Sequence, residues 1–217
     1  MLGLLDNPFW SSLTTLHRPL ARGSGDALRY PADVAPFVAV ARDGVPLDEA
    51  LAAPGELMYA IGPWPARAGI SLEDLGVVVQ MVCDSPASVP PGPAIETART
   101  ADVVALAALV YPHYFRPRTT ELGRYFGIYE DGMLVAMAGE RMGMPGYREI
   151  SAVCTHPDHV GRGLARRVLA FLATDIAAGG ATPFLQVSPS NARAIHLYEQ
   201  NGFRTRTELP FAAIRRS

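Results

Sequence analysis

The chain has 217 residues, 49% of them hydrophobic and 18% charged, so it can bury a core and lacks the composition of a disordered protein. All 19 basic residues are arginines, which excludes chemistry that needs a lysine of this chain, such as Schiff-base catalysis or a P-loop lysine. The formal net charge of −2 disfavours a nucleic-acid binder that relies on bulk positive charge.

The cysteines and the N-terminal segment bear on the compartment. Two cysteines, Cys83 and Cys154, are too few for a disulfide framework, which favours a reducing environment. The first residues show no basic region before an apolar run, and no stretch reaches the ~18 apolar residues of a membrane span. We therefore expect a cytoplasmic protein with no membrane or nucleic-acid partner.

Charge divides the chain into two parts. Residues 1–88 carry 5 arginines and 10 acidic residues, whereas residues 89–217 carry 14 arginines and 11 acidic residues. The change falls at the proline-rich residues 85–93, which cannot lie inside a helix or a central strand. We interpret this stretch as a linker between an N-terminal α/β lobe (residues 1–84) and a C-terminal domain (residues 94–217).

In the N-terminal lobe, short apolar runs bounded by turn residues predict strands. They lie at residues 37–41, 57–61 and 76–83, and a short helix is predicted at 47–53. Nothing in this lobe has the pattern of a reaction centre.

The C-terminal domain begins with a predicted helix and three antiparallel strands. The Asp131-Gly132 pair between two apolar runs is a strong hairpin signal. In chain order, we expect a helix at 101–110, strands at 125–129, 133–137 and 149–155, a helix at 161–178, a strand at 184–187, a helix at 191–200 and a strand from 203.

A glycine-containing loop joins the third of these strands to the long helix. Gly161 and Gly163 let the backbone approach a ligand, and the helix start offers free N–H groups at the positive end of its dipole. The loop lacks the third glycine of the dinucleotide fingerprint and does not open a βαβ unit. It therefore predicts a pyrophosphate site of another kind. Positive charge is added by Arg162, Arg166 and Arg167.

The next predicted helix carries a second motif. Asn191, Ala194 and Tyr198 are spaced so that they share one face. The small Ala194 leaves room between an amide and a phenol, which suits a narrow ligand lying along the helix.

In this order and at this spacing, the two motifs resemble those of the GNAT superfamily of N-acetyltransferases, over roughly residues 94–210. The resemblance implies an α/β (α+β) fold, with a mixed, mostly antiparallel sheet flanked by helices, and acetyl-CoA as the acyl donor. The family loop usually reads Gln/Arg-x-x-Gly-x-Gly/Ala. Gly163 and Ala165 fit this pattern, whereas Val160 stands where a polar residue is usual.

The resemblance also implies site residues. Backbone groups of Val153, Cys154 and Thr155 would pair with the pantetheine arm as an added strand pairs with a sheet edge. Asn191 would contact the pantetheine beside Ala194, and Tyr198 would stand near the sulfur as general acid. Backbone amides of the loop and helix start would hold the pyrophosphate, in a stretch that comprises Val160, Gly161, Arg162, Gly163, Leu164, Ala165 and Arg166.

Three alternatives stay open for the general base. Glu149 comes first, because superfamily enzymes often use a carboxylate on that strand. Glu140 on the neighbouring strand could face the same cleft, and a water relay to solvent is the third alternative. Some family members carry a glutamate five residues before the Asn191 position, but here that residue is Gln186, which cannot accept a proton.

Two other chemistries are disfavoured. His156, Asp158 and His159 lie too close together, with a proline between them, to give good tetrahedral metal geometry, so we expect no metal. Cys154 has no His–Asp pair that the sequence places beside it, so we interpret it as a small core residue rather than an acyl-carrying nucleophile.

The resemblance implies a small-molecule amine or a peptide as acceptor, and the sequence does not identify it. The family lines its acceptor side with the segment after the first helix, which predicts substrate roles for His113, Tyr114, Arg116 and Arg118, with an ordinary exposed loop as an equal alternative. The N-terminal lobe is interpreted either as a degenerate copy of the same half-fold beside the acceptor cleft or as a dimerisation element, which leaves a homodimer open.

Two rival functions remain: a non-catalytic acyl-CoA sensor, favoured by Gln186, and an acyltransferase that uses a longer acyl chain or a hydroxyl acceptor.

Overall fold

The computed structural model describes residues 3–110 and 114–216. Within these ranges the helices are α1 (Pro8–Thr14), α2 (Thr100–Val110), α3 (Leu164–Ala178) and α4 (Ala192–Glu199). The strands of the same residues are β1 (Arg22–Ser24), β2 (Ala27–Arg29), β3 (Val38–Val40), β4 (Leu57–Ile61), β5 (Ile70–Val82), β6 (Glu96–Thr97), β7 (Tyr125–Glu130), β8 (Met133–Met144), β9 (Tyr147–Thr155), β10 (Thr182–Val187) and β11 (Arg204–Arg216).

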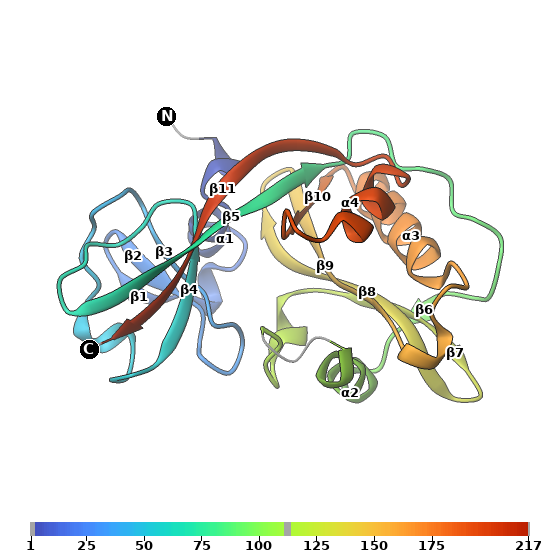
Figure 1. Ribbon diagram of the computed structural model, residues 1–217, viewed down its shortest axis with the longest axis horizontal. Coiled ribbons are helices and arrows are strands. Elements are labelled where there is room, and N and C mark those ends of the chain that lie inside the picture. Colours follow the sequence, from blue (N-terminus) through green and yellow to red (C-terminus); the bar gives the residue numbers. More distant parts are fainter. Residues whose placement is uncertain (1–2, 111–113, 217) are drawn as a thin grey trace.

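Two lobes are joined by the long strands β5 and β11, which run from one to the other (Figure 1). In the part of the chain that the structure describes, β1-β2-β3 form a small sheet, and a large sheet has the order β4-β11-β5-β10-β9-β8-β7-β6. Neighbouring strands of the large sheet are antiparallel except β9 and β10. The predicted fold class, a mixed and mostly antiparallel sheet flanked by helices, is confirmed.

The predicted hairpin between β7 and β8 is confirmed. Glu130 pairs with Met133, and the two residues between them, Asp131 and Gly132, have φ of 48° and 80°. Two positive φ values are what a two-residue turn needs to match the twist of its strands, and Asp-Gly tolerates them.

Several elements differ from the sequence expectation. The helix α1 and the short strands β1 and β2 carry too little periodicity to be predicted, and the helix expected at 47–53 is a 3₁₀ turn, Glu49–Leu51. The strand expected from residue 76 begins at Ile70. The first half of β5 is mostly exposed, but it pairs with β11.

This pairing also bears on the predicted division at residues 85–93. The strands β4 and β5 precede that stretch and β11 follows it, yet β11 lies between β4 and β5 and pairs with both. The stretch itself is tied to α3, because the Arg167 side chain donates hydrogen bonds to the carbonyls of Pro90 and Pro93. The two segments thus share one sheet, and their division into domains stays a prediction.

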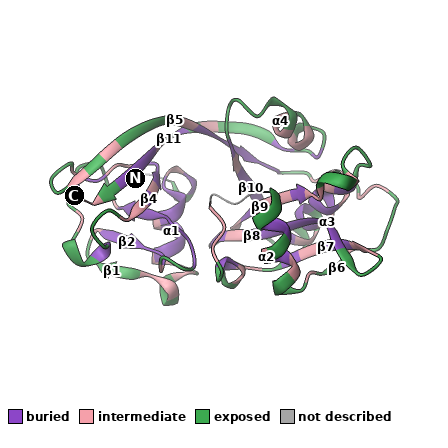
Figure 2. Cartoon of the chain, turned by 60° about the horizontal axis from the view of Figure 1, so that its bottom comes forward, coloured by how far each residue is buried: buried purple, intermediate pink, exposed green. Residues whose placement is uncertain are grey.

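The buried residues form several clusters. One joins Phe9 and Tyr30 of the first lobe to Met142 of β8, whereas in another α3 packs its apolar face on the large sheet through residues such as Leu169 and Leu172. Figure 2 shows these cores in purple and the mostly exposed α4 in green and pink, in agreement with the absence of buried residues in that helix. No helix in the described ranges is both long and apolar enough to cross a bilayer.

Candidate functional site

The strands β9 and β10 part from one another halfway along their length. Their parallel pairing covers only Thr182 to Phe184 against Tyr147 to Glu149, after which β10 stays paired with β5. The residues that follow in both strands, 150–154 and 186–188, line one cleft of ≈ 410 Å³. Splayed strands present facing backbone edges, so an extended ligand can pair with them as an added strand would.

A β-bulge shapes the β9 side of this cleft. Ser151 pairs with Gly139 and Cys154 with Met137, so two residues of β9 oppose one residue of β8. The first of the two, Ala152, has φ of 52°, a left-handed conformation that costs a residue with a side chain about 1–3 kcal/mol. An alanine gives no sequence signal for this, so the bulge could not be predicted.

The predicted pyrophosphate loop leads from β9 into α3. Gly161 and Gly163 have φ of 81° and 74°, which explains the glycines, and Gly163 caps the helix that begins at Leu164, later than expected. A Cβ on either glycine would meet no atom of the described residues within 4 Å, so the loop backbone is open to a ligand. The loop and the first turn of α3 hold the predicted stretch from Val160, itself 54% exposed, to Arg166.

The three arginines of this region differ in what they bind. Both terminal nitrogens of Arg162 lie 2.7 Å from Glu130 carboxylate oxygens, and this hydrogen bonding lowers the pKa of Glu130. Arg167 binds the proline-rich stretch. Arg166 is exposed and makes no ion pair with the residues that the structure describes, so it is the side chain that leaves its charge available at the helix start.

The histidines beside this loop have local partners. His156 Nδ1 accepts a hydrogen bond from the Asp158 amide at 3.3 Å, and His159 Nδ1 lies 3.2 Å from Glu130. In residues 3–110 and 114–216 no group of three His, Cys, Asp or Glu side chains is placed to hold a metal ion.

The second motif meets the splayed strands at the cleft. The Asn191 side chain accepts a hydrogen bond from the Ala194 amide at 3.1 Å, which caps α4. Asn191, Ala194 and Tyr198 all line the cleft, together with Val153 and Cys154 of β9. The helix face predicted from their spacing therefore lies where the two strands diverge.

Not every predicted cofactor residue lies in this cleft. Thr155 ends β9 outside it, and the loop residues 160–166 lie beyond it at the start of α3. Their individual roles stay predictions.

Cys154 shows no sign of nucleophilic activation. Its side chain is buried in the cluster under α2, and this burial raises the pKa of the Cys154 thiol to about 12. A thiol is a nucleophile only as thiolate, so the structure gives Cys154 the core role expected for it.

Five residues from distant segments form the opposite wall of the cleft, here called the aromatic wall: Phe37, Ile61, Val78, Tyr114 and Phe211. Tyr114 was predicted as a substrate residue. The other four residues carry no sequence signal for a substrate role, because each lies in an apolar run that predicts only a strand.

The other predicted substrate residues are placed differently. Arg118 lies outside the cleft and pairs with Glu121 at 2.6 Å and Asp33 at 2.9 Å, which fastens its segment to the first lobe. Arg116 does not line the cleft either. His113 lies outside the described residues.

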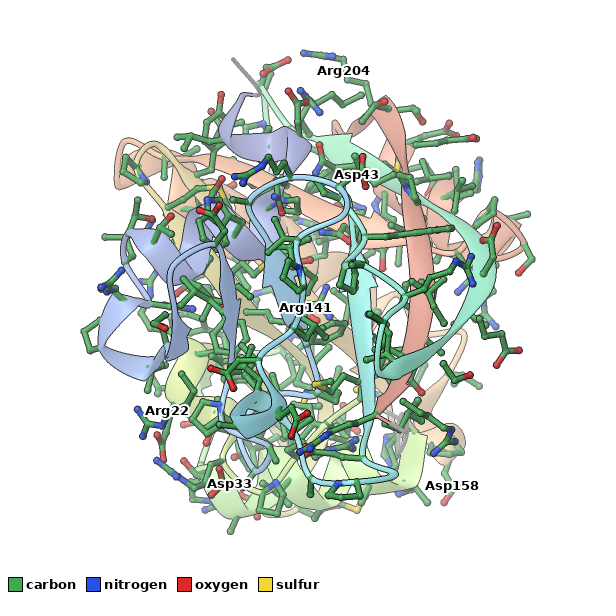
Figure 3. The ribbon with its side chains drawn as sticks, turned by 90° about the vertical axis from the view of Figure 1, so that its left-hand side faces the viewer. Arg22, Asp33, Asp43, Arg141, Asp158 and Arg204 are labelled. Atoms are coloured by element: carbon green, nitrogen blue, oxygen red, sulfur yellow. The ribbon has the colours of Figure 1, made fainter. Side chains whose placement is uncertain are left out.

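An ion pair between Arg141 and Glu149 lies at the base of the aromatic wall. Two guanidinium nitrogens of Arg141 bind the two carboxylate oxygens of Glu149 at 2.6 Å each. Glu149 is 0% exposed and does not line the cleft, whereas Arg141 does. The Arg141 guanidinium also lies 5.1 Å from the centre of the Phe37 ring. Figure 3 labels Arg141 near the middle of the view, behind the ribbon of the first lobe.

The second predicted carboxylate has a different partner. Arg124 Nε donates to Glu140 at 3.0 Å, and another nitrogen of Arg124 lies 2.7 Å from Asp175 of α3. The expectation that Glu140 and Glu149 face the same cleft is wrong, because neither lines it. Successive side chains of a strand point to opposite faces. Arg141, not Glu140, shares a face with Glu149.

Gln186, which stands where some relatives carry a glutamate, lines the cleft on β10. Its side-chain oxygen and nitrogen are both screened from solvent and find no hydrogen-bond partner among the described residues. Buried polar atoms of this kind cost free energy unless a ligand or water binds them.

Comparison with known proteins adds independent findings. The family model described as "FR47-like protein" matches residues 125–212. No curated protein matches the chain. Among solved structures, a Novosphingobium aromaticivorans protein described as an acetyltransferase from the GNAT family is 31% identical, with a TM-score of 0.84 and 100% of both chains covered.

Two more distant structures share the fold. A GCN5-related N-acetyltransferase of Kribbella flavida is 19% identical, with a TM-score of 0.65 and coverage of 98% of this chain and 96% of that one. A GCN5-related N-acetyltransferase-like protein of Streptococcus suis is 14% identical, with a TM-score of 0.55 and coverage of 94% and 91%.

Proposed function

The chain belongs to the GNAT family of acetyltransferases, and from this premise we propose that it transfers an acetyl group from acetyl-CoA directly to a primary amine. The observation that carries the proposal is the meeting of the splayed strands β9 and β10 with the Asn191–Tyr198 face of α4 at one cleft. The open glycine loop follows directly after β9 and leads into α3.

The residues present fit acetyl-CoA. The divergence of β9 and β10 offers backbone groups of Val153 and Cys154 to the two amides of a pantetheine arm. The open, positive-φ loop and the start of α3 suit a pyrophosphate, to which Arg166 adds charge. Bound acetyl-CoA would supply the acyl group as a reactive thioester.

In the proposed reaction, the amine nitrogen forms a bond to the thioester carbonyl carbon and the carbon–sulfur bond breaks. The protein must hold the two groups about 3–3.5 Å apart, which the narrow cleft between β9 and the aromatic wall supports. We assign the Tyr198 hydroxyl as the proton donor to the leaving sulfur, because it is the acidic hydroxyl that α4 brings to the cleft. An amide of the bulged segment near Val153 would hydrogen-bond the carbonyl oxygen.

The attacking amine must lose a proton, and the positions of the two glutamates favour one of the three alternatives for the base. Glu149 is fully buried behind Arg141, and Glu140 is paired with Arg124. Neither lines the cleft. We therefore propose that the proton leaves through water in the cleft rather than to a carboxylate.

The test is release of free CoA thiol from acetyl-CoA with a panel of amines. Amine-dependent release, with a product acetylated on nitrogen by mass spectrometry, supports the proposal. Binding of acetyl-CoA without release with any amine points to the non-catalytic sensor. Faster release from longer acyl-CoAs, or with alcohols in place of amines, points to the other acyltransferase.

A further inference from the structure

The acceptor side of the cleft has a chemistry of its own, and from it we propose the class of amine. The acceptor carries its amino group on an aromatic or bulky apolar body and brings no second positive charge. This inference rests on the acetyl transfer proposed above and deepens it.

The aromatic wall is a set of rings that hold one another in place. The Tyr114 ring centre lies 6.2 Å from that of Phe37, in a stacked arrangement, and 6.5 Å from that of Phe211, edge to face. Tyr59, behind them, lies 4.9 Å from Tyr114 and 5.7 Å from Phe211. Rings that pack in this way form a preorganised apolar surface, which favours a flat or bulky apolar partner.

The charges around the wall disfavour a second cation. Among the described residues that line the cleft, none is acidic, so a distant ammonium group would find no counter-ion there. The nearest carboxylate considered above, Glu149, is 0% exposed and already bound by two nitrogens of Arg141. Leaving water for such a site costs a cation free energy that no carboxylate on this wall offsets.

Arg141 strengthens this selection. The guanidinium lines the cleft and its carboxylate partner does not, so the pair turns its positive end toward the acceptor. The same guanidinium lies 5.1 Å from the Phe37 ring centre and 5.5 Å from that of Phe9. One cation-attracting ring of the wall, Phe37, is therefore already used by a side chain of the protein.

The wall also gives the first lobe a role. Phe37 precedes β3 and Ile61 ends β4, while Val78 and Phe211 lie on the interlobe strands β5 and β11. Residues that precede the predicted acetyltransferase domain thus supply three of the five wall residues, Phe37, Ile61 and Val78.

The experiment compares apolar primary amines with amines that carry a second charge. We would measure kcat/KM of CoA release for 2-phenylethylamine, cyclohexylmethylamine, 1,4-diaminobutane and spermidine. Calorimetry of 2-phenylethylamine and 1,4-diaminobutane on the CoA-saturated protein gives a readout that does not depend on turnover. We expect the two apolar amines to exceed the diamine and spermidine at least tenfold in kcat/KM, and 2-phenylethylamine to bind at least tenfold more tightly than the diamine.

The outcomes separate the two proposals. Equal or better use of 1,4-diaminobutane or spermidine, with acetyl transfer intact, overturns the acceptor class alone. Failure of acetyl-CoA to bind, or absence of release with every amine, overturns the proposed function and this inference with it.

A pair of variants tests the wall itself. Phe211→Ala should raise KM for 2-phenylethylamine roughly tenfold and leave KM for acetyl-CoA within twofold. The matched control is Phe171→Ala. Phe171 belongs to α3 and is equally half-buried, but it packs on Phe126, with ring centres 5.2 Å apart. Equal effects of the two variants would overturn the assignment. Phe211→Leu, which keeps most of the volume, serves if Phe211→Ala does not fold, and should raise KM about threefold.

Discussion

The two sides of the cleft are built on different principles. The side assigned to the acyl donor uses backbone: a bulged strand edge, a loop with two positive-φ glycines, and a helix start, all within residues 150–198. The aromatic wall uses side chains, drawn from five segments between Phe37 and Phe211 and fixed by ring packing and a buried ion pair. Donor recognition should therefore respond to changes of backbone conformation, and acceptor recognition to changes of side-chain volume and charge.

The largest expected effect concerns the ion pair under the wall. Arg141→Leu leaves the Glu149 carboxylate buried without its charge partner, which should lower the free energy of unfolding by about 3–5 kcal/mol. For a chain of this length the midpoint of thermal unfolding, Tm, should fall by roughly 6–20 °C. The double variant Arg141→Leu/Glu149→Leu should recover most of the loss, and an equal loss in both variants would show that the pair does not support the wall.

The next effect lies where the two sides meet. Tyr198→Phe should lower kcat roughly 100-fold, because the leaving sulfur loses its proton donor, while KM for acetyl-CoA stays within about twofold. Tyr129→Phe is the control, since the Tyr129 hydroxyl donates to Asp102 at 2.9 Å, away from the cleft. Unchanged turnover of Tyr198→Phe across the pH range would refute the assignment.

The prediction that the donor side binds acetyl-CoA through its backbone can be tested at the two glycines on either side of α3. Gly163 and Gly180 flank α3 with φ of 74° and 79°, and a Cβ at either would meet no described atom within 4 Å. Gly163→Ala and Gly180→Ala should each cost about 1–2 kcal/mol of stability by the same strain. Only Gly163→Ala should weaken acetyl-CoA binding, by roughly threefold to tenfold in a calorimetric titration; equal affinities would contradict a donor site built on this loop.

The smallest effect concerns Cys154. Because burial raises its pKa to about 12, about one thiol in 10⁴ is ionised at pH 8, and alkylation of the native protein should be correspondingly slow and rise tenfold per pH unit. The pKa of the Cys154 thiol is higher in the folded than in the unfolded protein. Its contribution to the free energy of unfolding is therefore complete below pH 9, the ordinary pKa of a thiol, and is lost as the pH rises toward 12. Rapid labelling of native Cys154 at pH 8 would reopen an acyl-cysteine route.

The donor side could be predicted from the sequence because its signals are local. Gly161 and Gly163 at a strand-to-helix junction, and Asn191, Ala194 and Tyr198 at helical spacing, each lie within one turn or one loop. The structure brings the α4 residues to the divergence of β9 and β10, where a shared ligand would need them.

The aromatic wall could not be predicted in the same way. Phe37 and Phe211 lie 174 positions apart in the numbering and meet only because β11 returns to the first lobe and pairs with β4 and β5. The Ala152 bulge has no residue-type signal. Strand alternation places Glu140 and Arg141 on opposite faces of β8. Only the structure shows that it is Arg141 that pairs with Glu149.

The central claim is tested most directly by measuring the Tm of the unmodified chain with and without acetyl-CoA. At about 100 times its dissociation constant, acetyl-CoA should stabilise the folded protein by ~2.7 kcal/mol. That corresponds to a rise in Tm of roughly 5–10 °C for a chain of this length. An unchanged Tm at millimolar acetyl-CoA and with longer acyl-CoAs would contradict the claim that this cleft and loop form an acyl-CoA site.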